Sequence, residues 1–309
     1  MRRGIVVAVA LILLAPVAPA AGAAAPVLLI DQDFADPDVV ATDSGYAAYS
    51  TSSASGRIPV AQAASPAGPW AIAGDALGAA PSWADPDGGF WAPDVTPRPG
   101  GGFLMYFSAV STEIGLMCVG VATADAATGP FTPTGTAPLI CDPADNGDID
   151  PQTHLTTDGT RYLLYKSNGI SPGPPSAIWS QGLTADGLAL AGPRTELLRA
   201  DLPEERAVVE APAPVRVDGG TVLFYSADEF LSRGYHTSYA VGPDLSGPFV
   251  KAEPPLLSTD GLGGAVESPG GADVVDGHIF FHGWLGGQRL ARGLYVLPIR
   301  FEGTSPVLG

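Results

Sequence analysis

Three carboxylates stand at the start of proline-containing segments, in a pattern suited to acid–base chemistry. They are Asp36 in Ala35-Asp36-Pro37, Asp150 in Ile149-Asp150-Pro151 and Glu210 in Val209-Glu210-Ala211-Pro212. Charged residues make up only 15% of the chain, and Asp150 and Glu210 have apolar neighbours, so burying them needs a compensating reason. Hydrolysis of a glycosidic bond would be such a reason. A protonated carboxyl group donates its proton to the leaving oxygen, while an ionised carboxylate activates water or attacks carbon.

The surroundings of each carboxylate favour a different role. Glu210 has the most apolar flanks, which suits a proton donor with a raised pKa. Asp36 lies in a polar stretch beside Asp38, which suits an ionised base, and Asp150 would supply the negative charge that keeps Glu210 protonated. Taken singly, each motif is also typical of a simple turn start. The carboxylates most easily confused with these three are Asp38, Asp94, Asp148 and Glu267.

The three motifs belong to a longer repeat. Prolines recur at intervals of about 56 to 61 residues, a period that suits one four-stranded blade, at Pro37, Pro93, Pro151, Pro212 and Pro269. A following aromatic strand recurs with them, marked by Tyr49, Tyr106, Tyr165 and Tyr225, with His282 in the fifth such place. Turns of the form Gly-Pro-aromatic close three repeats, at Gly68, Gly129 and Gly247.

About five strand-rich repeats, each too small to bury its own apolar face, predict an all-β fold, a five-bladed β-propeller. The high content of Gly (40) and Pro (31) favours short strands and turns, and no extended helical period is visible. In a propeller the first strand of each blade lies nearest the axis, so the carboxylates would converge on a central funnel. A β-sandwich or an open solenoid is the alternative architecture.

The N-terminal segment predicts export. Arg2 and Arg3 precede an apolar run from Ile5 to Leu14, and small residues such as Ala18-Pro19-Ala20 offer a cleavage site. We expect residues 1–25 to be a secretory signal peptide and residues 26–309 to form one secreted, extracellular propeller domain. A retained membrane anchor is the alternative, although the apolar run is short for a membrane span.

The charge balance limits the partners. The chain has 15 Lys and Arg against 32 Asp and Glu, and loss of Arg2 and Arg3 would change the formal net charge from −17 to −19. Nucleic acids and anionic membranes require a basic surface, so we expect neither as a partner after signal cleavage. A neutral carbohydrate is the easier match, and we expect a monomer.

The two cysteines, Cys118 and Cys141, both fall near the end of the second repeat. An oxidising compartment favours a disulfide bond between them. Two buried free thiols are the alternative. A zinc site is not indicated, because no second cysteine or histidine stands at ligand spacing.

Taken together, the acidic motifs in this order and spacing resemble glycoside hydrolase family 43, which includes arabinanases, α-L-arabinofuranosidases and β-xylosidases. The resemblance covers nearly all of the chain after residue 25. It implies a five-bladed propeller and inversion of the anomeric centre. It also implies that Asp36 is the general base, Asp150 the residue that modulates and orients the acid, and Glu210 the general acid.

Further positions carry over from the same resemblance. His282 corresponds to a histidine that holds a hydrated ion, commonly calcium, in arabinanase-like members, although a hydrogen-bonded core imidazole is the alternative; no other cofactor is expected. Arg292 resembles an arginine of the substrate pocket. Trp91 could stack on a sugar or pack in a blade, and Asp94 could bind a sugar hydroxyl or cap a turn. The fifth repeat departs from the family pattern at residues 267–271.

These features favour a secreted, inverting hydrolase of arabinose- or xylose-containing plant cell-wall polysaccharides, such as arabinan or xylan, or of their oligosaccharides. The alternative is a non-catalytic propeller that binds carbohydrate, and its mark would be a missing acid or base. Asp36, Asp150 and Glu210 are all present. A structural or protein-binding propeller would not need carboxylates at the axis.

Overall fold

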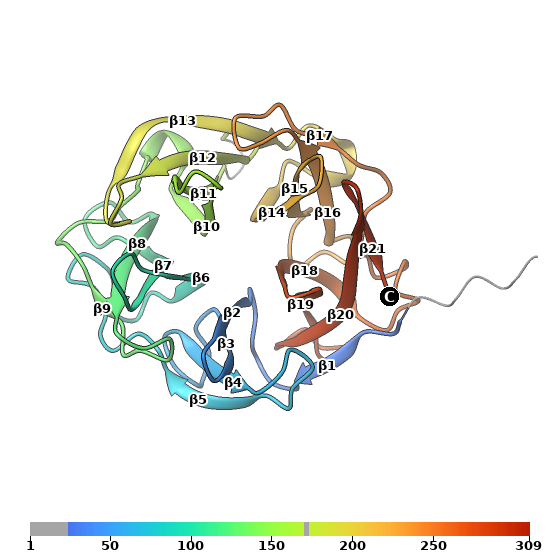
Figure 1. Cartoon of the computed structure of the whole chain (residues 1–309), viewed down its shortest axis with the longest axis horizontal. Coiled ribbons are helices and arrows are strands. Elements are labelled where there is room, and N and C mark those ends of the chain that lie inside the picture. Colours follow the sequence, from blue (N-terminus) through green and yellow to red (C-terminus); the bar gives the residue numbers. More distant parts are fainter. Residues whose placement is uncertain (1–23, 170–172) are drawn as a thin grey trace, which may run out of the picture.

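The computed structural model describes residues 24–169 and 173–309, and strands dominate this part of the chain. The described strands form five antiparallel sheets, which surround a central axis as blades (Figure 1). The predicted five-bladed β-propeller is therefore confirmed. The predicted signal peptide, residues 1–25, falls almost entirely outside the described residues and stays a prediction.

Four blades are meanders of consecutive strands. Blade 1 comprises β2 (Asp38–Thr42), β3 (Gly45–Tyr49), β4 (Pro59–Ala63) and β5 (Ala71–Asp75). Blade 2 comprises β6 (Phe90–Pro97), β7 (Phe103–Val110), β8 (Met117–Ala124) and β9 (Thr132–Pro133). Blade 3 comprises β10 (Asp148–Leu155), β11 (Arg161–Ser167), β12 (Ala177–Leu183) and β13 (Leu190–Arg199). Blade 4 comprises β14 (Val209–Val217), β15 (Gly220–Ala227), β16 (His236–Gly242) and β17 (Val250–Lys251).

Blade 5 closes the ring with strands from both ends of the chain. It comprises β18 (Glu267–Val275), β19 (His278–Trp284), β20 (Arg292–Glu302) and the N-terminal β1 (Val27–Ile30), and β21 (Ser305–Leu308) pairs with β20. Because β1 pairs with β20, the two ends of the chain hold the ring together, and closure protects the sheet edges.

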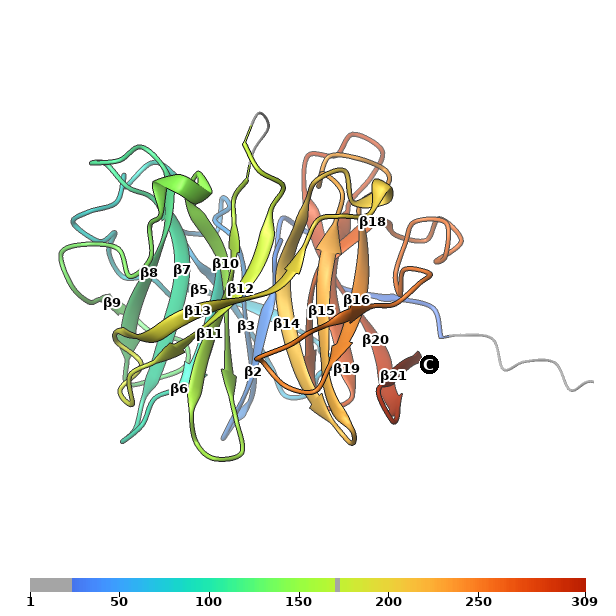
Figure 2. The ribbon, with the colours of Figure 1, turned by 90° about the horizontal axis from the view of Figure 1, so that it is seen from above.

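Two short 3-10 helices, η1 (Pro143–Asp145) and η2 (Pro203–Glu205), lie on one face of the ring, the upper face in Figure 2. They stand in the loops that enter blades 3 and 4. Among the described residues, no helix has the length and apolarity needed to cross a membrane.

The core lies between neighbouring blades. The second strands are almost continuously apolar, as in β7, because each blade packs against a neighbour on both of its faces. Between blades 1 and 2, for example, Tyr49 packs edge-to-face on Phe131, and Phe90 and Phe107 complete the same buried cluster. A disulfide bond joins Cys118 in β8 to Cys141 ahead of η1, as predicted.

One residue near the start of every blade has a left-handed backbone. These residues are Asp36 (φ 52°), Ala92 (43°), Asp150 (54°), Ala211 (50°) and Gly271 (58°). A proline follows in the first four blades. In the fifth blade Ser268 (φ 54°), before Pro269, is left-handed too, but Gly271, which Ala272 follows, makes the contact that the other four residues make. The true fifth repeat therefore lies three residues beyond Pro269, which corrects the alignment by prolines. Strand pairing sets the register here, and a glycine adopts the left-handed conformation without a proline beside it.

The same register also changes which residues of the other blades are equivalent to His282. It pairs with Gly270, the residue before the left-handed position. The residues that meet this position in the other blades are Thr51, Ser108, Lys166 and Ser226. His282 is thus equivalent to these polar residues and not to the repeated tyrosines, since Tyr49 pairs with Asp38, two residues further along β2.

These polar side chains tie each blade to the next. In four junctions the side chain accepts the N–H of the next left-handed residue: Thr51 from Ala92 (3.0 Å), Ser108 from Asp150 (3.2 Å), Ser226 from Gly271 (2.9 Å) and His282 from Asp36 (3.1 Å). At the fifth junction Lys166 has no acceptor, and the N–H of Ala211 binds Asp150 Oδ2 instead (2.9 Å). The fold thereby fixes the backbone beside each predicted site residue.

In three of the five blades a buried carboxyl group stands two residues beyond the left-handed position, at Asp38, Asp94 and Asp273. Asp38 accepts the N–H of Val95 (2.9 Å), and Asp273 accepts the N–H of Val39 (2.8 Å), each across a junction. Burial raises the pKa of Asp94 to about 7 and that of Asp273 to about 6. Burial also raises the pKa of Asp38, and the negative charges of Asp94 and Asp273 raise it further.

The substitution Asp94→Asn should flatten the pH dependence of stability. The folded-state pKa of Asp94 lies above its ordinary value of 3.8, so the folded state holds a proton that the unfolded state has lost between about pH 4 and pH 7. The free energy of unfolding therefore falls as pH rises through this window, and Asp94 accounts for a slope of about 1.4 kcal/mol per pH unit. Urea unfolding across the window measures both slopes.

The exposed Asp43→Asn is the matched control and should keep the slope of the unmodified protein. Equal slopes in the Asp94→Asn variant and the unmodified protein would contradict a buried, protonated Asp94.

Candidate active site

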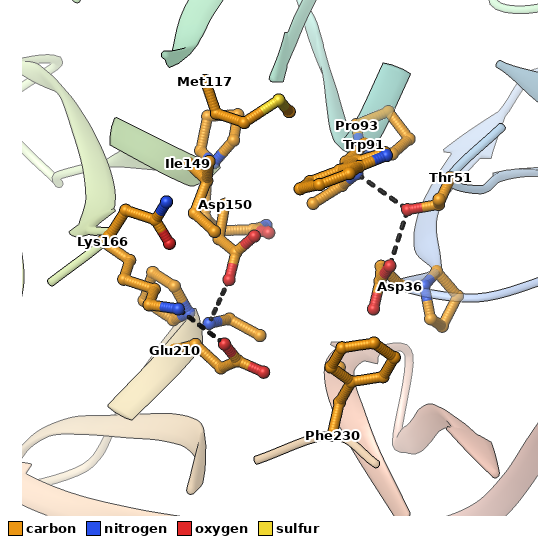
Figure 3. A pocket seen from close by; sticks show the side chains of 18 of the residues that line it. Asp36, Thr51, Trp91, Pro93, Met117, Ile149, Asp150, Lys166, Glu210 and Phe230 are labelled. Atoms are coloured by element: carbon orange, nitrogen blue, oxygen red, sulfur yellow. Dashed lines mark hydrogen bonds and ion pairs between the residues drawn. The ribbon is translucent and has the colours of Figure 1, made fainter. Parts of the chain in front are cut away.

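A cavity of about 670 Å³ lies where the starts of the five blades meet. Asp36, Asp150 and Glu210 all line it, although they come from three different blades (Figure 3). Asn146, which follows η1, lines it as well, so the cavity opens on the face that carries the 3-10 helices (Figure 2). Among the described residues, the four carboxylates that the sequence made easy to confuse with these do not line it: Asp38, Asp94, Asp148 and Glu267.

Asp36 is held as a carboxylate on one side of the cavity. Its Oδ2 accepts a 2.6 Å hydrogen bond from the Thr51 hydroxyl, and Arg292 donates to both oxygens at 3.1 and 3.3 Å. Burial alone would raise the pKa of Asp36, but the Arg292 guanidinium, then His282, whose Nδ1 lies 3.2 Å from Oδ1, and last the Thr51 hydroxyl outweigh burial and hold this pKa well below its usual range. Asp36 is therefore ionised, as a base must be.

Glu210 lies on the other side, with a donor on each oxygen. The Nζ atom of Lys166 lies 2.8 Å from Oε2, and the hydroxyl of Tyr235 donates to Oε1 at 2.7 Å. The ammonium and the hydroxyl come from β11 and from the loop before β16, so two neighbouring blades fix the orientation of this carboxyl group.

The pKa of Asp150 is raised above the ordinary value for an aspartate. Burial, and then the negative charge of Glu210, raise the pKa of Asp150 to about 7, against the opposing effect of Lys166. Asp150 and Asp36 thus titrate far apart, although both are aspartates at the left-handed position. Two carboxyl environments with separated pKa values are what glycoside hydrolysis requires.

Two aromatic side chains stand at the cavity. Trp91, predicted to bind substrate, lines it and is 39% exposed. Phe230 lines it too, on the side of Asp36 away from Trp91 (Figure 3), and is 43% exposed. Phe230 stacks on Trp284, and the Arg292 guanidinium lies 5.3 Å from the Phe230 ring centre. Such half-exposed rings suit the apolar face of a sugar.

Asp94 is placed differently from its predicted role. Its side chain is 2% exposed and does not line the cavity. The predicted contact with a sugar hydroxyl is therefore corrected to a buried position outside the cavity. Strand pleating explains the difference, because Asp94 lies beyond the bulge that turns Trp91 towards the cavity.

His282, to which the resemblance assigned a hydrated ion, has protein groups near both ring nitrogens. Its Nδ1 is engaged by the backbone N–H of Asp36, and Nε2 lies 3.5 Å from a cationic nitrogen of Arg292. Burial and the Arg292 charge lower the pKa of His282, against the opposing effect of the Asp36 carboxylate.

Lys166, Tyr235 and Phe230 are site residues that sequence patterns did not reveal. Tyr235 and Phe230 lie in an irregular loop between β15 and β16, where no periodicity marks a residue. Lys166 had one available signal, since a lone lysine in an apolar strand needs a buried partner.

Comparisons with known proteins agree with this geometry. The family model for glycosyl hydrolases family 43 matches residues 25–301. A search of curated proteins found no sequence relative. The solved structures include a thermostable family-43 glycoside hydrolase, with 25% identity and a TM-score of 0.79 over 90% of this chain and 93% of that one.

Two further structures show the same fold. An endo-1,4-beta-xylanase from Bacteroides thetaiotaomicron is 24% identical, with a TM-score of 0.76 over 92% of this chain and 97% of that one. A Bacillus subtilis arabinanase is 20% identical, with a TM-score of 0.69 over 90% and 98%. On the family match over most of its length, the chain belongs to family 43 of the glycosyl hydrolases and is a glycoside hydrolase.

Proposed function

We propose that this glycoside hydrolase cleaves arabinose- or xylose-containing plant cell-wall polysaccharides or their oligosaccharides, with inversion at the anomeric carbon. The observation that carries the proposal is the ionised Asp36 facing the Asp150 and Glu210 pair across one cavity (Figure 3). The substrate class is supported by three similar structures, which are named as a xylanase, an arabinanase and an α-L-arabinofuranosidase.

In this mechanism the sugar lies between Asp36 and Glu210. Glu210 donates its proton to the glycosidic oxygen as the bond to the anomeric carbon breaks. Asp36 takes a proton from a water molecule, whose oxygen attacks the opposite face of that carbon. Asp150, whose pKa is raised to about 7 by burial and the charge of Glu210, lies against the backbone of the Glu210 segment and thereby modulates and orients the acid.

Arg292 has two tasks in this proposal. It holds Asp36 ionised, and its position beside Phe230 lets it reach a sugar hydroxyl in the cavity. Trp91 and Phe230 would contact the apolar faces of the sugar from either side of Asp36.

We also propose that the enzyme is exported after cleavage near residue 25, acts outside the cell as a monomer, and requires no metal ion. The N-terminal charge and apolar pattern supports export. The Arg292 guanidinium beside His282 supports a site that needs no added cation.

The substitution Glu210→Gln should abolish turnover while substrate binding remains, because glutamine keeps the shape but has no proton to donate. We expect a loss of about 10² to 10⁴ in kcat, and a similar loss in Asp36→Asn. The assay is a panel of 4-nitrophenyl α-L-arabinofuranoside, 4-nitrophenyl β-D-xyloside, linear arabinan and xylan. NMR of the first product should show the inverted anomer.

Retention of configuration would contradict the direct attack of water. Binding of the sugars with no turnover by the unmodified protein would instead support a carbohydrate-binding propeller.

The substitution Phe230→Ala should weaken substrate binding with little change in kcat. Loss of one aromatic contact predicts an increase in KM of roughly 3- to 10-fold. Leu231→Ala is the matched control, because Leu231 is the next residue of the same loop, is exposed and does not line the cavity. Equal KM values for both variants would contradict a sugar contact by Phe230.

Treatment with EDTA followed by gel filtration should leave kcat and KM unchanged, and added CaCl₂ should not raise them. The reason is that both imidazole nitrogens of His282 already face protein groups. A loss of activity that calcium restores would show that an ion binds elsewhere in the cavity.

A further inference from the structure

The junction between blades 3 and 4 differs from the other four. At the equivalent place in the other blades stand Thr51, Ser108, Ser226 and His282, and each accepts the N–H of the next left-handed residue. Lys166 occupies this place in blade 3, and an ammonium group has donors but no acceptor. The repeat would therefore leave the N–H of Ala211 unpaired.

Asp150 compensates for the missing acceptor. Its Oδ2 accepts the N–H of Ala211 at 2.9 Å, and this N–H adjoins Glu210 in the chain. The carboxyl group of Asp150 is thus held against the backbone of the segment that carries Glu210. The Asp36 carboxylate makes no equivalent hydrogen bond to the next blade, because the Thr51 hydroxyl accepts the N–H of Ala92 at that junction.

Lys166 uses its freed donors on Glu210. The lysine is 5% exposed, and its Nζ lies 2.8 Å from Glu210 Oε2. Burial alone would lower the pKa of Lys166, but the charges of Glu210 and Asp150 outweigh it and raise this pKa. Lys166 therefore stays an ammonium ion beside both members of the acid pair.

We propose that Lys166 is the positioning residue of the acid pair: it orients Glu210 directly, and by offering no acceptor to Ala211 it requires Asp150 to lie against the Glu210 segment. The inference rests on the proposed function of this cavity. Lys166 does not touch the bond that is cleaved, and it acts through the two carboxyl groups.

The charges around Glu210 define the expected pH effect. Lys166 on β11, Asp150 on β10 and the Tyr235 hydroxyl lie nearest, and Asp36, His282 and Arg292 face Glu210 from further away. A cation favours the ionised form of a carboxyl group, and Lys166 lowers the pKa of Asp150, so loss of Lys166 should raise the pKa of Asp150 further. The alkaline limb of kcat/KM should then move to higher pH.

The test compares Lys166→Met and Lys166→Arg with the unmodified enzyme on whichever substrate of the panel it hydrolyses. In Lys166→Met we expect the alkaline limb to rise by about one pH unit and kcat to fall at least about 10-fold. Lys166→Arg keeps the charge, so its limb should stay close to that of the unmodified enzyme.

Lys251→Met is the matched control. Lys251 is also a shielded lysine, and it binds Glu205 and Asp201, but it lies on β17 and does not line the cavity. Its loss should lower the unfolding temperature without moving the pH profile. A folded Lys166→Met variant with the original limb and kcat would overturn the inference.

A second measurement does not need turnover. Titration of the carboxyl carbons by ¹³C NMR should show one Asp carboxyl with a higher pKa in Lys166→Met, and this signal should be missing in the Lys166→Met, Asp150→Asn double variant. If the unmodified protein hydrolyses nothing, the proposed function fails while this titration still decides on Lys166. An unchanged titration in Lys166→Met would overturn the inference.

Discussion

Each blade of this propeller is tied to its neighbour through the backbone N–H of one left-handed residue. A non-glycine residue in that conformation costs about 1–3 kcal/mol, and a buried N–H without a partner would cost a similar amount. The side chain of the preceding blade removes the second cost, so the two features stabilise one another. Asp36 and Asp150 stand at this position, and the geometry of the junction therefore presents their carboxyl groups to the cavity.

The same junctions create two different electrostatic environments. Arg292 and the Thr51 hydroxyl stabilise the negative charge of Asp36. Asp150 instead faces the negative charge of Glu210, and its burial also disfavours ionisation. Because the cavity is partly shielded from water, these few contacts shift the pKa values further than they would at the surface. Two residues of one type thus acquire opposite protonation preferences.

The features that repeat in every blade build the fold, whereas the residues that depart from the repeat build the active site. Apolar strands and junction contacts recur because every blade must pack on its neighbours. Lys166 breaks the pattern of acceptors, and Glu210 stands one residue before the left-handed position occupied by the two aspartates. Both departures lie at the junction of blades 3 and 4, where the acid pair is formed.

The sequence by itself determined the five-bladed ring, the disulfide and the meeting of Asp36, Asp150 and Glu210 in one cavity. These features are local motifs repeated at a regular period, and a closed ring brings equivalent positions together whatever the details. Only the tertiary structure decided the fifth register, the burial of Asp94 and the surroundings of His282. Strand pairing sets these, and a bulge of one residue changes which side chains face the axis. Lys166, Tyr235 and Phe230 also required the structure, as did the contact of Arg292 with Asp36. That contact spans 256 residues of sequence, and no local pattern encodes a contact that forms only on folding.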